Sequence, residues 1–71
     1  MEFDYSKLRG KIVETSGTIT QFCQDNGLSV QNVSKKLNNV AHFSIEDAIE
    51  ISKCLSIPDE EIHNYFFVAK D

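Results

Sequence analysis

Apolar residues recur three or four positions apart along most of the chain, and Ser, Thr, Asn, Gly or Pro residues separate the runs. Apolar positions at that spacing fall on one face of an α-helix, whereas a half-buried strand alternates apolar and polar residues. No run alternates convincingly at a period of two, although residues 65–68 are compatible with an extended segment. The pattern therefore predicts an all-α protein, with five short helices in one small bundle.

The first predicted helix begins after a cap at Asp4 or Ser6 and ends near position 14, before a Ser-Gly pair that breaks it. Charged side chains cover its outer side. Its buried side is predicted from three apolar residues at helical spacing: Tyr5, Leu8 and Ile12.

The central stretch of the chain predicts two short helices joined by a tight turn. Thr18, with Gln21 three residues later, has the spacing of a capping box at the start of the first of these helices. Ser29 has the position of an N-cap for the second, which we expect to run from Val30 to about residue 38. Gly27 ends the first helix, because glycine tolerates a positive φ. This order of helix, turn and helix is the helix-turn-helix pattern of DNA-reading proteins.

A fourth helix is predicted after Ser44, an N-cap with Asp47 at the capping-box position. Pro58 suits the first turn of a short last helix. The large apolar residues at positions 65–68 are compatible with chain-end packing or with the seam of a homodimer. The buried stripe of the fourth helix is predicted to contain its apolar residues: Ile45, Ala48, Ile49, Ile51 and Leu55.

The two cysteines, Cys23 and Cys54, occupy apolar positions of predicted helices, so we expect buried free thiols. The small side chain of Cys23 allows the two central helices to approach closely. With His42 and His63 the chain has the ligand count of a zinc finger, but no pair has the spacing that forms half a site. The sequence therefore predicts no metal and no cofactor.

The length of 71 residues suits one domain with a small core, covering residues 1–71. The sequence contains no segment that resembles a signal peptide and no apolar run near the roughly 18 residues that span a membrane. We therefore expect a cytoplasmic protein without a membrane partner.

The charge of the chain is unevenly distributed. The net charge is −4, and the isoelectric point is near 5.0, which is unusual for a protein whose main partner is a polyanion. Residues 1–43 contain five basic and four acidic side chains, whereas residues 44–71 contain two basic and seven acidic ones. The acidic part is suited either to face away from DNA or to face a basic partner.

The predicted order of five helices, with the helix-turn-helix as helices two and three, resembles the phage repressor and Cro family, also called XRE-like. The segments at positions 3–10, 57–58, 61–63 and 65–67 resemble short regulators of temperate phages of Gram-positive bacteria. That group includes Cro-like proteins and antirepressors of the modulator-of-repression type, which bind the phage repressor. The resemblance implies a lambda-repressor-like fold and a role in a genetic switch inside the bacterial host.

The resemblance also implies which residues face DNA. Gln31 and Lys35 match positions that face base edges, and Asn32 and Ser34 are helpers; glutamine and asparagine suit adenine, and lysine suits guanine. Contacts to phosphates at helix ends are expected from a second set of polar residues: Thr18, Gln21, Lys36 and Asn38.

Two positions depart from the pattern of the family. Glutamines commonly begin the two helices of the motif in repressors, but here Ile19 and Val30 are found. Ile19 lies three residues before Phe22 and is compatible with a core position. Val30, in the first turn of an exposed helix, is harder to bury and suits a thymine methyl group or a protein partner. We therefore expect both aliphatic residues at a protein interface.

Catalysis is not expected, because no base, nucleophile or metal site converges in the sequence. Two regulatory functions remain. The favoured one is an antirepressor that binds the N-terminal DNA-binding domain of a phage repressor, which the negative charge and the two missing glutamines support. The alternative is a Cro-like repressor that binds operator DNA directly. A regulator that binds DNA jointly with the repressor satisfies both sets of features.

Overall fold

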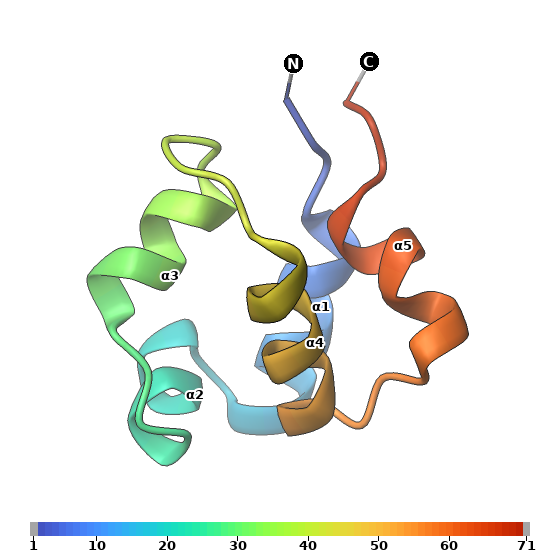
Figure 1. Cartoon of the computed structure of the whole chain (residues 1–71). Helices are drawn as coiled ribbons and strands as arrows, with labels where there is room; N and C mark the ends of the chain where they lie inside the picture. Colours follow the sequence, from blue (N-terminus) through green and yellow to red (C-terminus); the bar gives the residue numbers. More distant parts are fainter. Residues whose placement is uncertain (1, 71) are drawn as a thin grey trace.

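The computed structural model describes residues 2–70, which form short helices joined by loops, with non-helical segments at residues 2–5 and 67–70 (Figure 1). Within these residues there is no β-strand, only an isolated bridge between Phe3 and Ala69. The prediction of an all-α protein with five α-helices is confirmed for this part of the chain. The elements are α1 (Ser6–Ser16), α2 (Ile19–Asp25), α3 (Val30–Leu37), α4 (Ile45–Cys54), the 3₁₀ turn η1 (Asp59–Glu61) and α5 (Ile62–Phe66).

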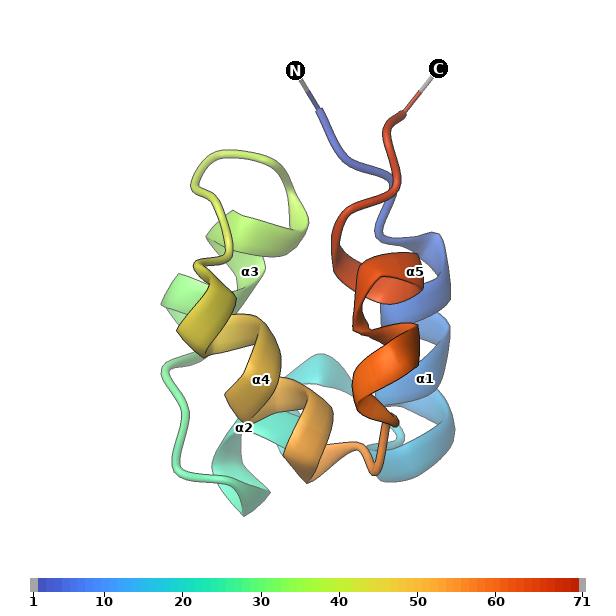
Figure 2. The same ribbon diagram turned by 45° about the vertical axis from the view of Figure 1, so that its right-hand side comes forward.

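The helices enclose one hydrophobic core. Helix α1 packs against α2 and α5, α2 packs against α3, and α4 packs against α5. Figures 1 and 2 both place the two chain ends close together beyond α1 and α5. Backbone hydrogen bonds hold these ends side by side, with 2.8 Å between the Asp4 nitrogen and the Val68 oxygen.

The core is built on aromatic residues from distant parts of the chain. Phe22 and Phe66 are fully enclosed. The ring of Phe43 meets those of Tyr5 and Phe66 edge-on, with centroids 5.2 Å apart in each pair. Edge-to-face contacts of this kind are favourable, so Phe43 connects the loop before α4 to both chain ends. The predicted burial of Tyr5 is confirmed.

Short-range signals at the helix ends are largely confirmed. The Ser29 hydroxyl accepts a hydrogen bond from the Asn32 nitrogen, and Ser44 forms the complete capping box expected with Asp47. At Thr18 only half of the predicted box exists, because the amide group of Gln21 donates to Asp25 instead. The Gln21 side chain is therefore bonded to the Asp25 carboxylate, one helical turn away, and does not complete the capping box.

Three other predictions are only partly right. Helix α1 continues two residues further than expected, to Ser16, and Gly17 ends it at φ 88°, in the Ser-Gly pair expected to break it. Tyr65 and Phe66 are helical and not extended, whereas Phe67 and Val68 lie outside the helix. Cys54 is half-buried, whereas Cys23 is fully buried as expected.

The predicted buried stripe of α4 is also partly wrong. Ile45 is 71% exposed and Ile49 is 39% exposed, although the other apolar positions of the stripe are buried. At about 100° per residue, the apolar arc from Ile51 to Ile49 spans about 160° of the helix surface. The core covers only the part of this arc around Ala48, and Ser52 is buried there instead. An aliphatic edge of α4 is left in solvent.

None of the helices in residues 2–70 has the length and apolar character needed to cross a membrane.

Candidate functional site

The residues of α3 that are expected to face DNA differ in how far they are exposed to solvent. Gln31, Asn32 and Lys35 are exposed, whereas Ser34 and Lys36 are half-buried. Consecutive residues of a helix point in different directions, so the five do not share one face. Helix α3 therefore offers two amides and one cation to a ligand directly.

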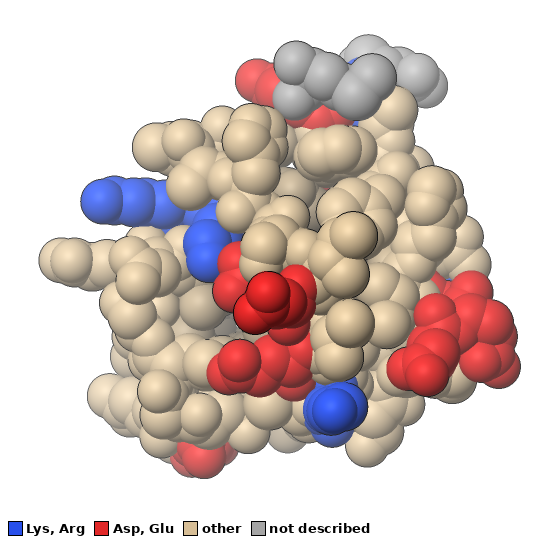
Figure 3. Space-filling model, viewed as in Figure 1, with Lys and Arg blue, Asp and Glu red and all other residues tan. Residues whose placement is uncertain are grey.

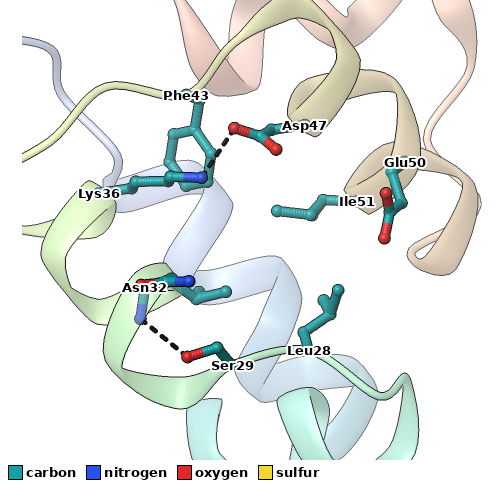
Figure 4. A pocket seen from close by; sticks show the side chains of 9 residues that line it. Leu28, Ser29, Asn32, Lys36, Phe43, Asp47, Glu50 and Ile51 are labelled. Carbon is teal, nitrogen blue, oxygen red and sulfur yellow. Dashed lines mark hydrogen bonds and ion pairs between the residues drawn. The ribbon is translucent and has the colours of Figure 1, made fainter.

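The side chain of Lys36 is half-buried against α4. Its Nζ atom lies 2.8 Å from the Oδ2 atom of Asp47 and 6.0 Å from the centre of the Phe43 ring (Figure 4). The hydrogen bond from Lys36, followed by that from the Ser44 nitrogen, lowers the pKa of the Asp47 carboxyl. This ion pair neutralises one of the two basic side chains of α3.

The residues expected to contact phosphates at helix ends are also engaged internally. The Thr18 hydroxyl accepts from the Gln21 nitrogen, and the Gln21 amide donates to Asp25 at 2.7 Å. The Oδ1 atom of Asn38 accepts a hydrogen bond from the Arg9 guanidinium at 2.7 Å. A phosphate at these positions would have to compete with bonds that already exist.

Ile19 and Val30 both pack against the core as half-buried residues. The expectation that Val30 is difficult to bury is therefore wrong, because its neighbours enclose part of the first turn of α3. Each residue presents only part of its side chain to a partner.

A small pocket of about 140 Å³ lies between α3 and α4. Figure 4 shows the side chains that line it, with Lys36, Asp47 and Glu50 as charged members and Leu28 and Ile51 as apolar ones. The volume is well below the several hundred Å³ of a typical cofactor site. It is suited to receive one side chain of a partner.

The outer face of α4 forms a second, more open hollow of about 510 Å³. Glu50 contributes to both hollows. Figure 3 shows that acidic side chains gather over α4 and over η1, while basic side chains lie beside α3 and next to the acidic group over α4, where Lys53 lines the same hollow as Glu46 and Glu50. The second hollow is lined by Glu46, Ile49, Glu50, Lys53 and Cys54.

The described residues contain no group of three or more His, Cys, Asp or Glu side chains arranged to hold a metal ion. Burial raises the pKa of the Cys23 thiol. Burial, and then the charge of Glu50, raises the pKa of the Cys54 thiol. Both cysteines are therefore poor thiolate nucleophiles.

Sequence reasoning missed several residues of these surfaces. Arg9 was read as an outward-facing residue of α1, but it reaches the end of α3. Asp47 was expected only as a helix cap, and nothing in local sequence indicates its partner Lys36 eleven residues away. One signal was available in the sequence. The apolar arc of α4 is too wide for a small core to bury completely, so some of its residues, here Ile45 and Ile49, stay exposed.

Comparison with known proteins identifies a family and a similar solved structure. A family model described as "Protein of unknown function (DUF739)" matches residues 1–69. No protein with a curated description matches the chain. A solved structure, the solution structure of the modulator of repression (MOR) of the temperate bacteriophage TP901-1 from Lactococcus lactis, is 37% identical in sequence, with a TM-score of 0.80. The alignment covers 94% of this chain and 90% of that one.

Proposed function

Since the chain belongs to the DUF739 family, and since it is similar to a phage modulator of repression over nearly its whole length, we propose that it is an antirepressor of a phage lysogeny switch. It binds the N-terminal DNA-binding domain of the phage repressor and blocks or alters operator binding. The observation that carries this proposal is the 37% identity to the modulator of repression. The proposed site of action is the cytoplasm of the bacterial host.

We further propose that residues 1–71 form a single domain of the lambda-repressor-like, XRE-like type, with α2 and α3 as its helix-turn-helix. Three local features support this. The caps Thr18 and Ser29 begin the two helices, and Gly27 adopts φ 67° in the turn between them. An antirepressor of this type has the fold of a DNA-binding regulator, but its surface is suited to bind a protein.

The expected interface at the start of the motif helices includes Ile19 and Val30. Both keep part of their apolar surface in solvent, and protein interfaces typically combine an apolar centre with a charged rim. Occlusion of the repressor's DNA-contacting surface would release it from its operator.

Titration of the purified repressor into this protein by calorimetry, together with a gel shift of the repressor on its operator, tests the proposal. We expect heat of binding at tens of micromolar in the absence of DNA, and loss of the operator shift at saturating protein. No heat at that concentration, or full retention of the repressor on DNA, contradicts the antirepressor role.

Val30→Asp tests whether the start of α3 belongs to the interface. A carboxylate buried without a partner costs about 2–5 kcal/mol, so the affinity should fall at least about tenfold. Val13→Asp is the matched control, because Val13 is 50% exposed and lies on α1. Circular dichroism melting should confirm that each variant is folded. Full affinity in a folded Val30→Asp protein removes Val30 from the interface.

Direct operator binding is the second candidate, favoured by the exposure of Gln31, Asn32 and Lys35 on one helix. In this alternative the purified protein shifts promoter DNA by itself. Lys35→Ala should then weaken binding and lower the salt slope by about one unit, as one phosphate contact is lost. No shift at low salt and micromolar protein contradicts the Cro-like reading.

A further inference from the structure

The outer face of α4 combines exposed aliphatic and acidic side chains. Ile45 is 71% exposed and Ile49 is 39% exposed. The two lie four residues apart, so they are neighbours on the helix surface. Glu46 directly follows Ile45, Glu50 directly follows Ile49, and both glutamates are exposed as well. We call these four residues the α4 face.

We propose that the α4 face is the docking surface for the positively charged, DNA-contacting surface of the repressor. This inference rests on the proposed function and deepens it, because it adds the outer face of α4 to the interface expected from sequence at the start of α2 and α3. Apolar contact is made by the two isoleucines, and the two glutamates pair with basic side chains of the partner.

Charge selects this partner. A repressor binds the phosphate backbone of DNA with lysine and arginine, so its DNA-contacting surface is positive. The segment of residues 44–71, which contains α4, has seven acidic and two basic side chains. Figure 3 shows the acidic side chains gathered over α4, with further acidic side chains over η1. A second copy of this chain would bring the same acidic segment to the contact, which complementary charge does not favour.

The shape of the surface fits the same partner. Glu50 lies between the open hollow on the outer side of α4 and the pocket between α3 and α4. The pocket, of about 140 Å³, has the apolar residues Leu28 and Ile51 in its lining. Glu50 is therefore the residue of the α4 face through which a partner comes nearest to the pocket beside α3.

The available apolar area also favours α4. Ile19 and Val30 are half-buried against the core, so much of their surface is already removed from water. Ile45, by contrast, leaves most of its side chain in solvent. Burial of an exposed aliphatic side chain at an interface contributes more than further burial of one that is half covered.

Calorimetry with the N-terminal domain of the cognate repressor tests the inference. Ile45→Ser/Ile49→Ser and Glu46→Lys/Glu50→Lys are each expected to weaken binding by about tenfold or more. Ile45→Ser alone is the variant least able to disturb folding, because Ile45 is the more exposed of the two isoleucines. It should reduce affinity several-fold.

Matched controls separate a local effect from a general one. Val40→Ser changes an aliphatic residue that is 73% exposed and should bind within about twofold of the unmodified protein. Asp59→Lys/Glu60→Lys makes the same change of net charge on η1, so it measures the general effect of charge and should weaken binding clearly less than Glu46→Lys/Glu50→Lys does. Equal loss in the two charge variants overturns the role of the α4 glutamates. Folding of every variant is checked by circular dichroism melting.

The outcomes distinguish the inference from the proposed function. If the unmodified protein binds the repressor domain and both α4 double variants bind within twofold, the inference is overturned and the proposed function stands. If no complex forms at tens of micromolar, both are overturned. If light scattering shows a dimer of this protein that Ile45→Ser dissociates, a second copy occupies the α4 face and the inference is overturned.

Discussion

At the scale of single residues, the Asp47 carboxylate connects two helices by accepting hydrogen bonds from Lys36 and from the Ser44 nitrogen. These bonds lower its pKa in the folded state, with the Lys36 bond as the largest cause. A lowered folded pKa contributes stability above the unfolded pKa of about 3.9 and loses it as the pH falls through the folded value. The pair is partly exposed, so its contribution is modest.

We therefore predict that Asp47→Asn lowers the free energy of unfolding by about 1 kcal/mol or less at neutral pH, since the amide keeps the cap but loses the charge. The difference from the unmodified protein should shrink below about pH 4 and vanish once Asp47 is protonated. Urea unfolding between about pH 2 and 7 measures it. Lys36→Met should show the same pH profile, while Lys35→Met serves as a control. A pH-independent difference would show that the ion pair is not its cause.

Residue-scale features were predictable where their cause is local. Caps at Thr18, Ser29 and Ser44 follow from side chains that bond to the backbone three residues away. The bond from Arg9 to Asn38 joins residues 29 positions apart and depends on how α1 meets the end of α3. No periodicity in the sequence encodes such a meeting, so the candidate phosphate contacts were predicted without their internal partners.

At the scale of elements, the glycines of α1 and of the α2–α3 turn have opposite roles. Gly10 lies inside α1 with open space where a Cβ atom would be, whereas Gly27 has the same open space but adopts φ 67°. Glycine in a helix interior costs roughly 0.5–1 kcal/mol relative to alanine, and a positive φ strains alanine by about 1 kcal/mol or more.

Gly10→Ala should accordingly raise the melting temperature, and Gly27→Ala should lower it. For a domain of this size, about 1 kcal/mol corresponds to roughly 4–8 °C. Thermal unfolding followed by circular dichroism measures both variants under one set of conditions. Because neither position is crowded, the pair isolates backbone conformation. Stabilisation by both substitutions would mean that the α2–α3 turn does not need its left-handed residue.

Helix α4 illustrates why element boundaries were easier to predict than faces. Its start at Ile45 follows from the Ser44 capping box, which is a local signal. Its buried side depends on how much of the apolar arc the other helices cover, which is a property of the assembled bundle. The core covers the side of Ala48 and Ile51 and leaves Ile45 exposed. The departure from the expected amphipathic pattern is the feature that makes α4 a candidate interface.

At the scale of the whole molecule, the charged residues are unevenly distributed between the two halves of the chain. The half that contains α2 and α3 is nearly balanced, and the half from α4 onwards is strongly acidic. This separation could be read directly from the sequence, as could the class of the fold. The position of the acidic surface relative to α3 required the structure, because the ion pair of Lys36 on α3 with Asp47 on α4 has no local signal in the sequence.

The same separation predicts how salt affects the proposed complex with a repressor. Complementary charge accelerates the encounter of two proteins, and at about 0.15 M salt screening limits that attraction to roughly 8 Å. Because this chain has a net charge of −4, its association rate with a basic repressor surface should fall several-fold as sodium chloride rises from about 0.05 to 0.5 M. The dissociation rate should change less, because short contacts govern it. Stopped-flow kinetics or surface plasmon resonance measures both rates. An association rate independent of salt would show that apolar contact alone guides the encounter, in which case the acidic residues of α4 do not select the partner.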